Sequence, residues 1–191
     1  MLAHALEFLL DTLLSLLTLA FLLRGLLQMT RAPFHNPLSQ SIVALTNFAV
    51  RPVRRLIPAI GAIDSASLLL AFATQFTLQL LVLLLRDFPL MVAGPQVFIV
   101  LLGMAGLGVI KLTLYLLLYA VIIQAVLSWV NPHAPFAPVL DSLTRPFLAP
   151  LRRSLPDLGG IDLSPLVVFM VVQLLLMLLV APLEFQLLHL L

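Results

Sequence analysis

The sequence predicts an all-α membrane protein, and two observations support this prediction. The first is composition, because 62% of the 191 residues are hydrophobic and only 9% are charged, against about 45–50% and about 25% in soluble domains. The second is that apolar residues gather in stretches near or above the ~20 residues that a helix needs to cross a bilayer. These stretches lack the strict alternation of barrel strands. We therefore expect helices that span a lipid bilayer.

The first apolar stretch, from about Leu6 to Gln28, is expected to remain in the mature chain. A cleavable secretory signal begins with a basic region. Here no Lys or Arg precedes Arg24, and the charged residues before it are Glu7 and Asp11. The first stretch therefore counts as a membrane helix rather than a leader.

Four more apolar stretches follow along the chain. They cover 65–85, 90–110, 112–130 and 163–183. Asp64 precedes the second stretch and Asp162 precedes the fifth, and aspartate is a preferred helix N-cap because its carboxylate accepts a bond from the first turn. The third stretch contains Gly94-Pro95 and three further glycines. It therefore either crosses the bilayer, lies in the interface or re-enters.

The distribution of basic residues favours four spanning helices. Short loops rich in Arg and Lys remain in the cytoplasm. If the third stretch does not cross, eight of the ten basic residues share one side with the two polar loops, against Arg86 and Lys111 on the other. If it crosses, the split is six to four. We predict four spanning helices plus one interfacial or re-entrant segment, with both termini outside. Five spanning helices is the alternative.

The two polar loops are similar to one another. Residues 44–75 and 142–173 align over 32 positions without a gap. Agreement at polar and turn-forming residues is informative because leucine is abundant throughout the chain. The matched pairs, each differing by 98 in number, are Arg54 and Arg152, Pro58 and Pro156, Gly61 and Gly159, Asp64 and Asp162, and Gln75 and Gln173. We interpret the chain as a tandem duplication of helix–loop–helix with parallel halves.

Both loops contain the pattern P-x-R-R-x-x-P-x-x-G-x-I-D before an apolar stretch. The matching residues are Pro52, Arg54, Arg55, Pro58, Gly61, Ile63 and Asp64, then Pro150, Arg152, Arg153, Pro156, Gly159, Ile161 and Asp162. With NPLSQ at 36–40 and LSWVNP at 127–132, the pattern resembles the YggT family of bacterial and plastid membrane proteins. NPLSQ has no full counterpart in the second half. The resemblance divides the chain into a first repeat at 1–87, an apolar connector at 88–111 and a second repeat at 112–191.

The resemblance implies a multi-pass protein of the bacterial inner membrane. It also implies a role in osmotic stress and potassium homeostasis, since YggT-type proteins are linked to osmotic stress and potassium uptake. The alternative is a membrane scaffold or assembly factor that organises other complexes through its basic cytoplasmic loops. Plastid relatives, associated with cytochrome b6 maturation and nucleoid distribution, imply that second role.

Each loop contains an arginine pair next to prolines. An amphipathic helix on the membrane surface is expected before each pair, and the prolines are expected to keep the backbone irregular around the arginines themselves. Arg54-Arg55 and Arg152-Arg153 either anchor the topology on lipid phosphates or form a surface that binds a partner or attracts ions. Asp64 and Asp162 are either N-caps or carboxylates at an ion entrance.

Within the apolar stretches, four glutamines are the candidate polar residues. They are Gln75, Gln79, Gln124 and Gln173. Such amides either bond between helices or line a pathway. Arg24 and Lys111 are placed near the ends of their stretches, where long side chains reach the interface.

The sequence contains no pattern typical of an enzyme. No cysteine is present, and the four histidines are scattered without a metal-binding spacing. We expect no catalytic residue, metal or cofactor. The lipid bilayer is the expected partner, with a membrane protein or a second copy of the chain as a further candidate. Nucleic acid is not expected, because the net charge is only +2.

Overall fold

The computed structural model describes residues 1–89, 94–154 and 162–190, and these residues form a bundle of helices. The elements are α1 (Leu2–Met29), α2 (Pro37–Leu56), α3 (Ser65–Leu85), α4 (Gln96–Val130), α5 (Ala137–Ser154), α6 (Ser164–Leu175), the π-helix η1 (Leu176–Val180) and α7 (Ala181–Leu188). Four helices are long and apolar enough to cross a membrane: α1, α3, α4 and the continuous segment Ser164–Leu188. The prediction of an all-α membrane protein with four spanning helices is confirmed.

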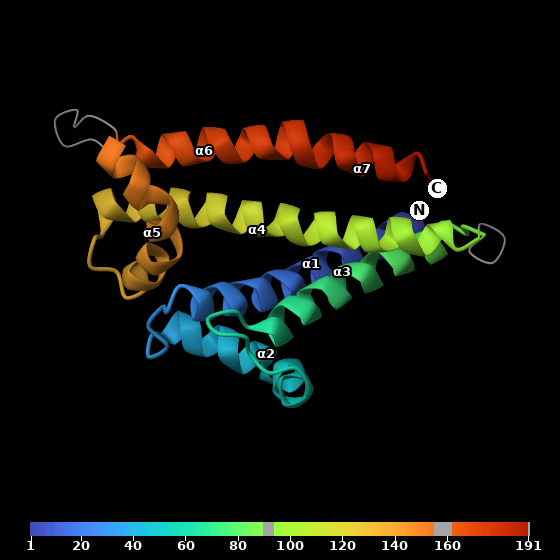
Figure 1. The fold of residues 1–191 in the computed structure, drawn as a ribbon, viewed down its shortest axis with the longest axis horizontal. Helices are drawn as coiled ribbons and strands as arrows, with labels where there is room; N and C mark the ends of the chain where they lie inside the picture. Colours follow the sequence, from blue (N-terminus) through green and yellow to red (C-terminus); the bar gives the residue numbers. More distant parts are fainter. Residues whose placement is uncertain (90–93, 155–161, 191) are drawn as a thin grey trace.

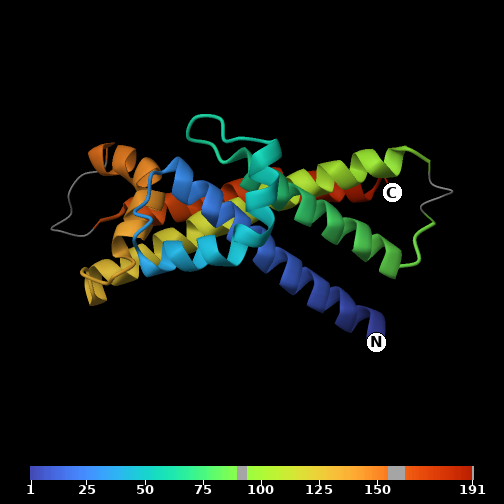
Figure 2. The ribbon, with the colours of Figure 1, turned by 90° about the horizontal axis from the view of Figure 1, so that it is seen from below.

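The long helices run alternately in opposite directions. Both termini lie at one end of the molecule, and the α1–α2 and α4–α5 connections lie at the other (Figure 1). Viewed from below, α1 diverges from the other helices toward its amino terminus (Figure 2). Many large apolar side chains remain exposed, Met170 and Met177 among them. Such a surface is stable against lipid rather than water.

The third apolar stretch is not a separate element. Residues 96–110 continue directly into 112–130 as α4, a helix of 35 residues and about 52 Å. This corrects the interfacial or re-entrant segment expected at 88–111, of which 90–93 lies outside the described residues. The glycines allow close packing instead of ending the helix. A Cβ at Gly103 would lie 3.0 Å from Leu187 Cδ1, and one at Gly108 would lie 2.5 Å from Gln75 Oε1.

The amphipathic helices are longer than expected, and this is a second correction. Helix α2 continues through Pro52, and α5 continues through Pro146 and Pro150, so both arginine pairs lie in a last helical turn rather than in irregular chain. All three prolines are exposed, so the backbone carbonyls that they leave unbonded can be solvated. Cationic side chains are also stabilised at a helix C-terminus by the helix dipole.

Each half of the chain has its own apolar core. Phe21, Val50 and Ala66 belong to the first core, between α1, α2 and α3. The second lies between α4, α5 and α6 and includes Val121 and Leu148. A third, smaller core joins the halves where the end of α1 packs against α5; its buried members are Leu27, Ala32, Val139 and Leu143.

Near the carboxyl terminus, the last spanning segment changes its helical pitch. Residues 176–180 form the π-helix η1 between α6 and α7. Pro182 is the second residue of α7, and proline lacks the N–H that an α-helix needs for its bond to the residue four positions earlier. A π-turn accommodates this interruption without ending the helix.

Candidate functional site

The first half contains a buried polar cluster built around Asp64. Asp64 is the N-cap of α3, and its side chain is fully buried. Its carboxylate accepts hydrogen bonds from Ser67 Oγ at 2.6 Å and from the Arg54 guanidinium at the end of α2. Arg54 also donates to Gln28 Oε1 on α1 at 3.0 Å. The cluster therefore connects α1, α2 and α3 through one carboxylate.

Arg24 on α1 completes this cluster. Its Nη1 donates to Thr46 Oγ1 at 2.8 Å and to Asn47 Oδ1 at 3.0 Å, and its Nε lies 3.9 Å from Asp64 Oδ2. Its position near the end of an apolar stretch predicted that the Arg24 side chain reaches the interface, whereas only 8% of that side chain is exposed. The difference arises because α2 supplies hydrogen-bond acceptors for Arg24, and the sequence alone does not show that α2 packs beside this arginine. A buried cation needs such partners.

The second half has a related but more exposed arrangement. Arg152 Nε donates to Asp162 Oδ2 at 2.7 Å, and the Ser164 backbone N–H donates to Asp162 Oδ1 at 2.9 Å. Burial acts to raise the pKa of Asp162, but the hydrogen bonds from Ser164 and Arg152 outweigh it, so the pKa lies below its ordinary value. Asp162 is therefore ionised at neutral pH, as the pairing with Arg152 requires.

Gln124 takes part in a separate cluster of the second half. It accepts a hydrogen bond from Thr144, which is fully buried, and donates to Asp141 Oδ1 at 3.2 Å. Thr46 and Thr144 are equivalent in the repeat, since their numbers differ by 98. Each forms a hydrogen bond with a polar residue of the long helix that precedes it in the chain, α1 or α4. Arginine is that partner in the first half and glutamine in the second.

The two arginines of each pair have different environments. Arg54 and Arg152 form ion pairs with the aspartate ten residues later. Arg55 and Arg153 are exposed, and within residues 1–89, 94–154 and 162–190 their side chains have no recorded hydrogen bond or ion pair. The second arginine of each pair is thus available to lipid or to another molecule.

The remaining candidate glutamines do not form one pathway. Gln75 is buried between α3 and α1, where its Nε2 lies 3.3 Å from Thr18 Oγ1. Gln79 is half-buried on α3, whereas Gln173, the sequence equivalent of Gln75, is exposed. The structure therefore brings Gln75 and Gln124 into different clusters.

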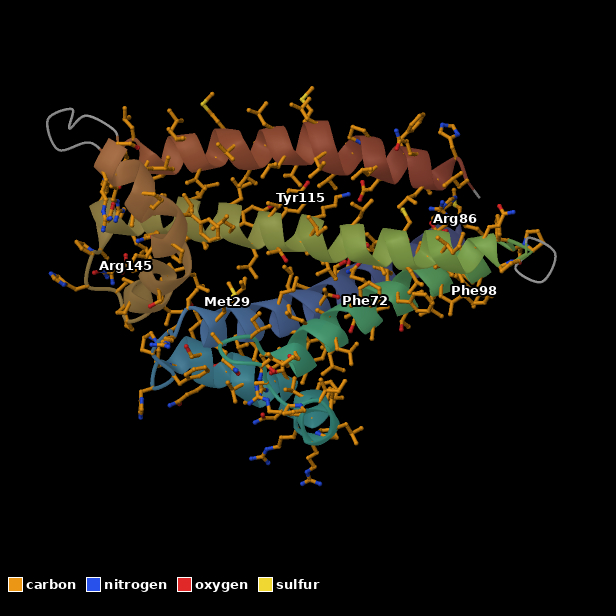
Figure 3. All side chains as sticks on the ribbon, viewed as in Figure 1. Met29, Phe72, Arg86, Phe98, Tyr115 and Arg145 are labelled. Atoms are coloured by element: carbon orange, nitrogen blue, oxygen red, sulfur yellow. The ribbon has the colours of Figure 1, made fainter. Side chains whose placement is uncertain are left out.

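Two ion pairs join residues that lie far apart in the sequence, and the sequence did not predict them. Lys111 Nζ, near the middle of α4, lies 2.9 and 3.0 Å from the two carboxylate oxygens of Glu184 on α7. Arg86, at the end of α3, donates to Glu7 on α1 at 2.9 Å; it lies at the opposite end of the molecule from Arg145 (Figure 3). The hydrogen bond to Glu7 raises the pKa of Arg86.

The Lys111–Glu184 pair corrects the expectation that Lys111 lies near a helix end. That expectation followed from dividing residues 90–130 into two stretches, and it changes because α4 is continuous. The signal in the sequence for Glu184 was an acidic residue two positions after Pro182 in a largely apolar segment. Among the described residues, no group of three His, Asp or Glu is placed to hold a metal ion.

These features define a class of protein: a multi-spanning, α-helical membrane protein with charged clusters between its helices. The family model described as CCB3/YggT matches residues 3–85 and again 104–183. The chain belongs to this family, as the resemblance of its loop pattern indicated.

Bacterial relatives support the same assignment. The YggT protein of Escherichia coli (strain K12) is 40% identical over 166 residues, which cover 86% of this chain and 83% of the relative. A Pseudomonas aeruginosa protein is 43% identical over 176 residues, covering 91% and 87%. A Vibrio alginolyticus protein is 39% identical over 172 residues, covering 89% and 90%. No solved structure matches the chain.

Proposed function

We propose that this protein is a non-enzymatic, multi-pass protein of the bacterial inner membrane that acts in the osmotic-stress response and in potassium homeostasis. The YggT-type loop pattern supports the functional class. The bacterial relatives and the helical architecture support the location, since outer-membrane proteins of bacteria are typically β-barrels. The two family-model matches, at 3–85 and 104–183, support an origin by tandem duplication.

The observation that carries the proposal is the ion pair between Lys111 and Glu184. Charged side chains within spanning helices are rare, and they commonly mark ion pathways or proton relays. Both partners lie in helices apolar enough to cross a membrane, and only 37% and 25% of their side chains are exposed. This pair is therefore the strongest candidate for a cation-handling group.

In this proposal the Glu184 carboxylate is the cation-binding group. In the described state both of its oxygens hold the Lys111 ammonium. Potassium carries the same single positive charge as the Lys111 ammonium group and binds oxygen ligands. In this proposal it therefore competes with the ammonium group for the Glu184 carboxylate. The adjoining π-helix η1 supports a functional role, because π-turns within α-helices frequently lie at functional sites.

A scaffold function is the second candidate, and the exposed arginines favour it. Arg55 lies beside Leu56, whose exposed fraction is 84%, and Phe48 on the same helix is 70% exposed. A surface that combines guanidinium groups with apolar side chains is typical of protein interfaces. In this alternative a membrane protein or a second copy of the chain binds at the loops.

Potassium flux into liposomes containing the purified protein tests the first proposal. We expect flux above that of protein-free liposomes, and a reduction of about tenfold or more for Glu184→Gln, since neutralising the carboxylate removes the charge that binds the cation. Glu7→Gln is the matched control, because Glu7 also forms an ion pair but with Arg86 at a helix end. It should conduct like the wild type.

A wild-type protein without flux, or equal loss in both variants, would contradict the cation-handling role. Growth under osmotic upshift in a strain lacking the protein then tests the alternative. If the protein is a scaffold, complementation should fail for the double variant Arg55→Gln, Arg153→Gln and succeed for Glu184→Gln. Cross-linking in the same cells would identify the partner.

A further inference from the structure

The two halves of the chain meet at an ordered seam at the loop end of the bundle. There the Asn36 side-chain amide donates to the Pro135 backbone carbonyl. Beside it, the buried side chains of Leu27 and Ala32 pack against Val139 and Leu143 of α5. Met29 at the end of α1 and Arg145 on α5 lie at this same end of the molecule (Figure 3).

A basic cleft lies on this seam. Its volume is about 470 Å³, and its walls include Thr30, Arg31, Asp141, Ser142 and Arg145. Arg31 belongs to the first half and Arg145 to the second, and Asp141 is the single acidic residue in the lining, so the cleft carries a net positive charge. The Asp141 carboxylate already accepts a hydrogen bond from the Gln124 amide. In the part of the chain that the structure describes, the Arg31 and Arg145 side chains have no recorded partner.

The backbone holds Arg31 in an unusual conformation. Its φ is 52°, in the left-handed region that non-glycine residues rarely adopt. Backbone hydrogen bonds from Arg31 N to Gln28 O at 3.2 Å and from Ala32 N to Leu27 O at 2.9 Å maintain the turn. The position of this arginine beside α5 is therefore set by an ordered turn that ends α1.

An apolar cavity lies next to the cleft. It has a volume of about 180 Å³ and lies between α1, α4 and α5, with Leu26, Met29, Leu117 and Phe147 among its lining residues. Thr30 and Pro146 belong to the walls of both the cleft and the cavity. The basic cleft and the apolar cavity thus share part of their walls.

We propose that the cleft and the cavity together bind one anionic phospholipid at the seam between the two halves. The phosphate is held by Arg31 and Arg145, which as guanidinium groups can each donate two parallel hydrogen bonds to phosphate oxygens. Part of one acyl chain occupies the cavity between α1, α4 and α5. Basic pockets between membrane helices are typical sites for anionic headgroups. The bound lipid would connect the halves by charge and by apolar contact at once.

Native mass spectrometry of the delipidated full-length protein tests the proposal. The probes are phosphatidylglycerol and phosphatidylcholine with identical acyl chains. We expect the protein to retain phosphatidylglycerol about tenfold more strongly than phosphatidylcholine. The double variant Arg31→Gln, Arg145→Gln should abolish this preference, because it removes the charge-assisted hydrogen bonds to the phosphate. The double variant Arg55→Gln, Arg153→Gln removes the same charge from the exposed last turns of α2 and α5. It should keep the preference.

A second variant separates a lipid from a free anion. Leu117→Trp fills the apolar cavity without changing the charge, and it should reduce retention of phosphatidylglycerol while its melting temperature reports that the protein is folded. Unchanged retention in this variant, or full displacement of the lipid by excess inorganic phosphate, would show a simple anion site and overturn the proposal. Equal retention of both lipids by the wild type would also overturn it.

Discussion

At the scale of single residues, the two arginines of each pair have different roles. Arg54 neutralises a carboxylate whose side chain has no exposed area, and Arg152 does the same for the more exposed Asp162. Arg55 and Arg153 are exposed instead. The loop pattern therefore contains one structural and one surface arginine, and this arrangement occurs in both halves.

This division predicts different effects on stability. Arg54→Gln should destabilise the protein by about 1–3 kcal/mol, because the buried Asp64 carboxylate loses a charged donor. Arg55→Gln should change stability by less than about 0.5 kcal/mol, as expected for an exposed residue that takes no part in a buried hydrogen bond or ion pair. Reversible unfolding of the purified variants in mixed micelles measures both values. Equal losses in the two variants would contradict the assignment.

At the scale of elements, the glycines of α4 distinguish close packing from helix interruption. Gly108→Ala should destabilise, because the new Cβ would collide with the Gln75 amide that bonds Thr18. Gly106→Ala is the matched control, since its Cβ would lie 3.9 Å from Phe72. It should be neutral or stabilise by up to about 1 kcal/mol through higher helix propensity. The melting temperatures of the two variants in detergent measure the difference.

These elements also show what the sequence could and could not predict. The helices follow from apolar length, and the position of Asp64 as the N-cap of α3 follows from N-cap chemistry. The same prediction for Asp162 is one residue off, because Leu163 is the N-cap of α6 and Asp162 precedes it. The continuity of α4 could not be predicted, because glycine is permissive both for a break and for a close contact. The Lys111–Glu184 pair joins residues 73 apart. A contact over this separation leaves no periodic pattern in the sequence, so only the packed structure reveals it.

At the scale of the whole molecule, the arrangement predicts a single topology. Four crossings place both termini on one side of the membrane, and the two amphipathic helices follow from the opposite end (Figure 1). The loop end also carries eight of the ten basic residues, so the positive-inside rule predicts that it lies in the cytoplasm. Single cysteines at Ser41 and Ser154 should therefore both be shielded from a membrane-impermeant thiol reagent in intact cells, while one at His4 should react. Shielding of only one of the two loops would require an odd number of crossings between them.

The length of α4 has a consequence for the bilayer itself. A helix of about 52 Å is longer than a hydrocarbon core of about 30 Å, and even tilted by about 40° it still covers about 40 Å, close to the full thickness with headgroups. Its ends therefore lie among headgroups, and a thinner membrane favours a larger tilt of α4. Stretching thins a membrane, so hydrophobic mismatch makes the angle of α4 sensitive to membrane tension, the mechanical variable that turgor changes.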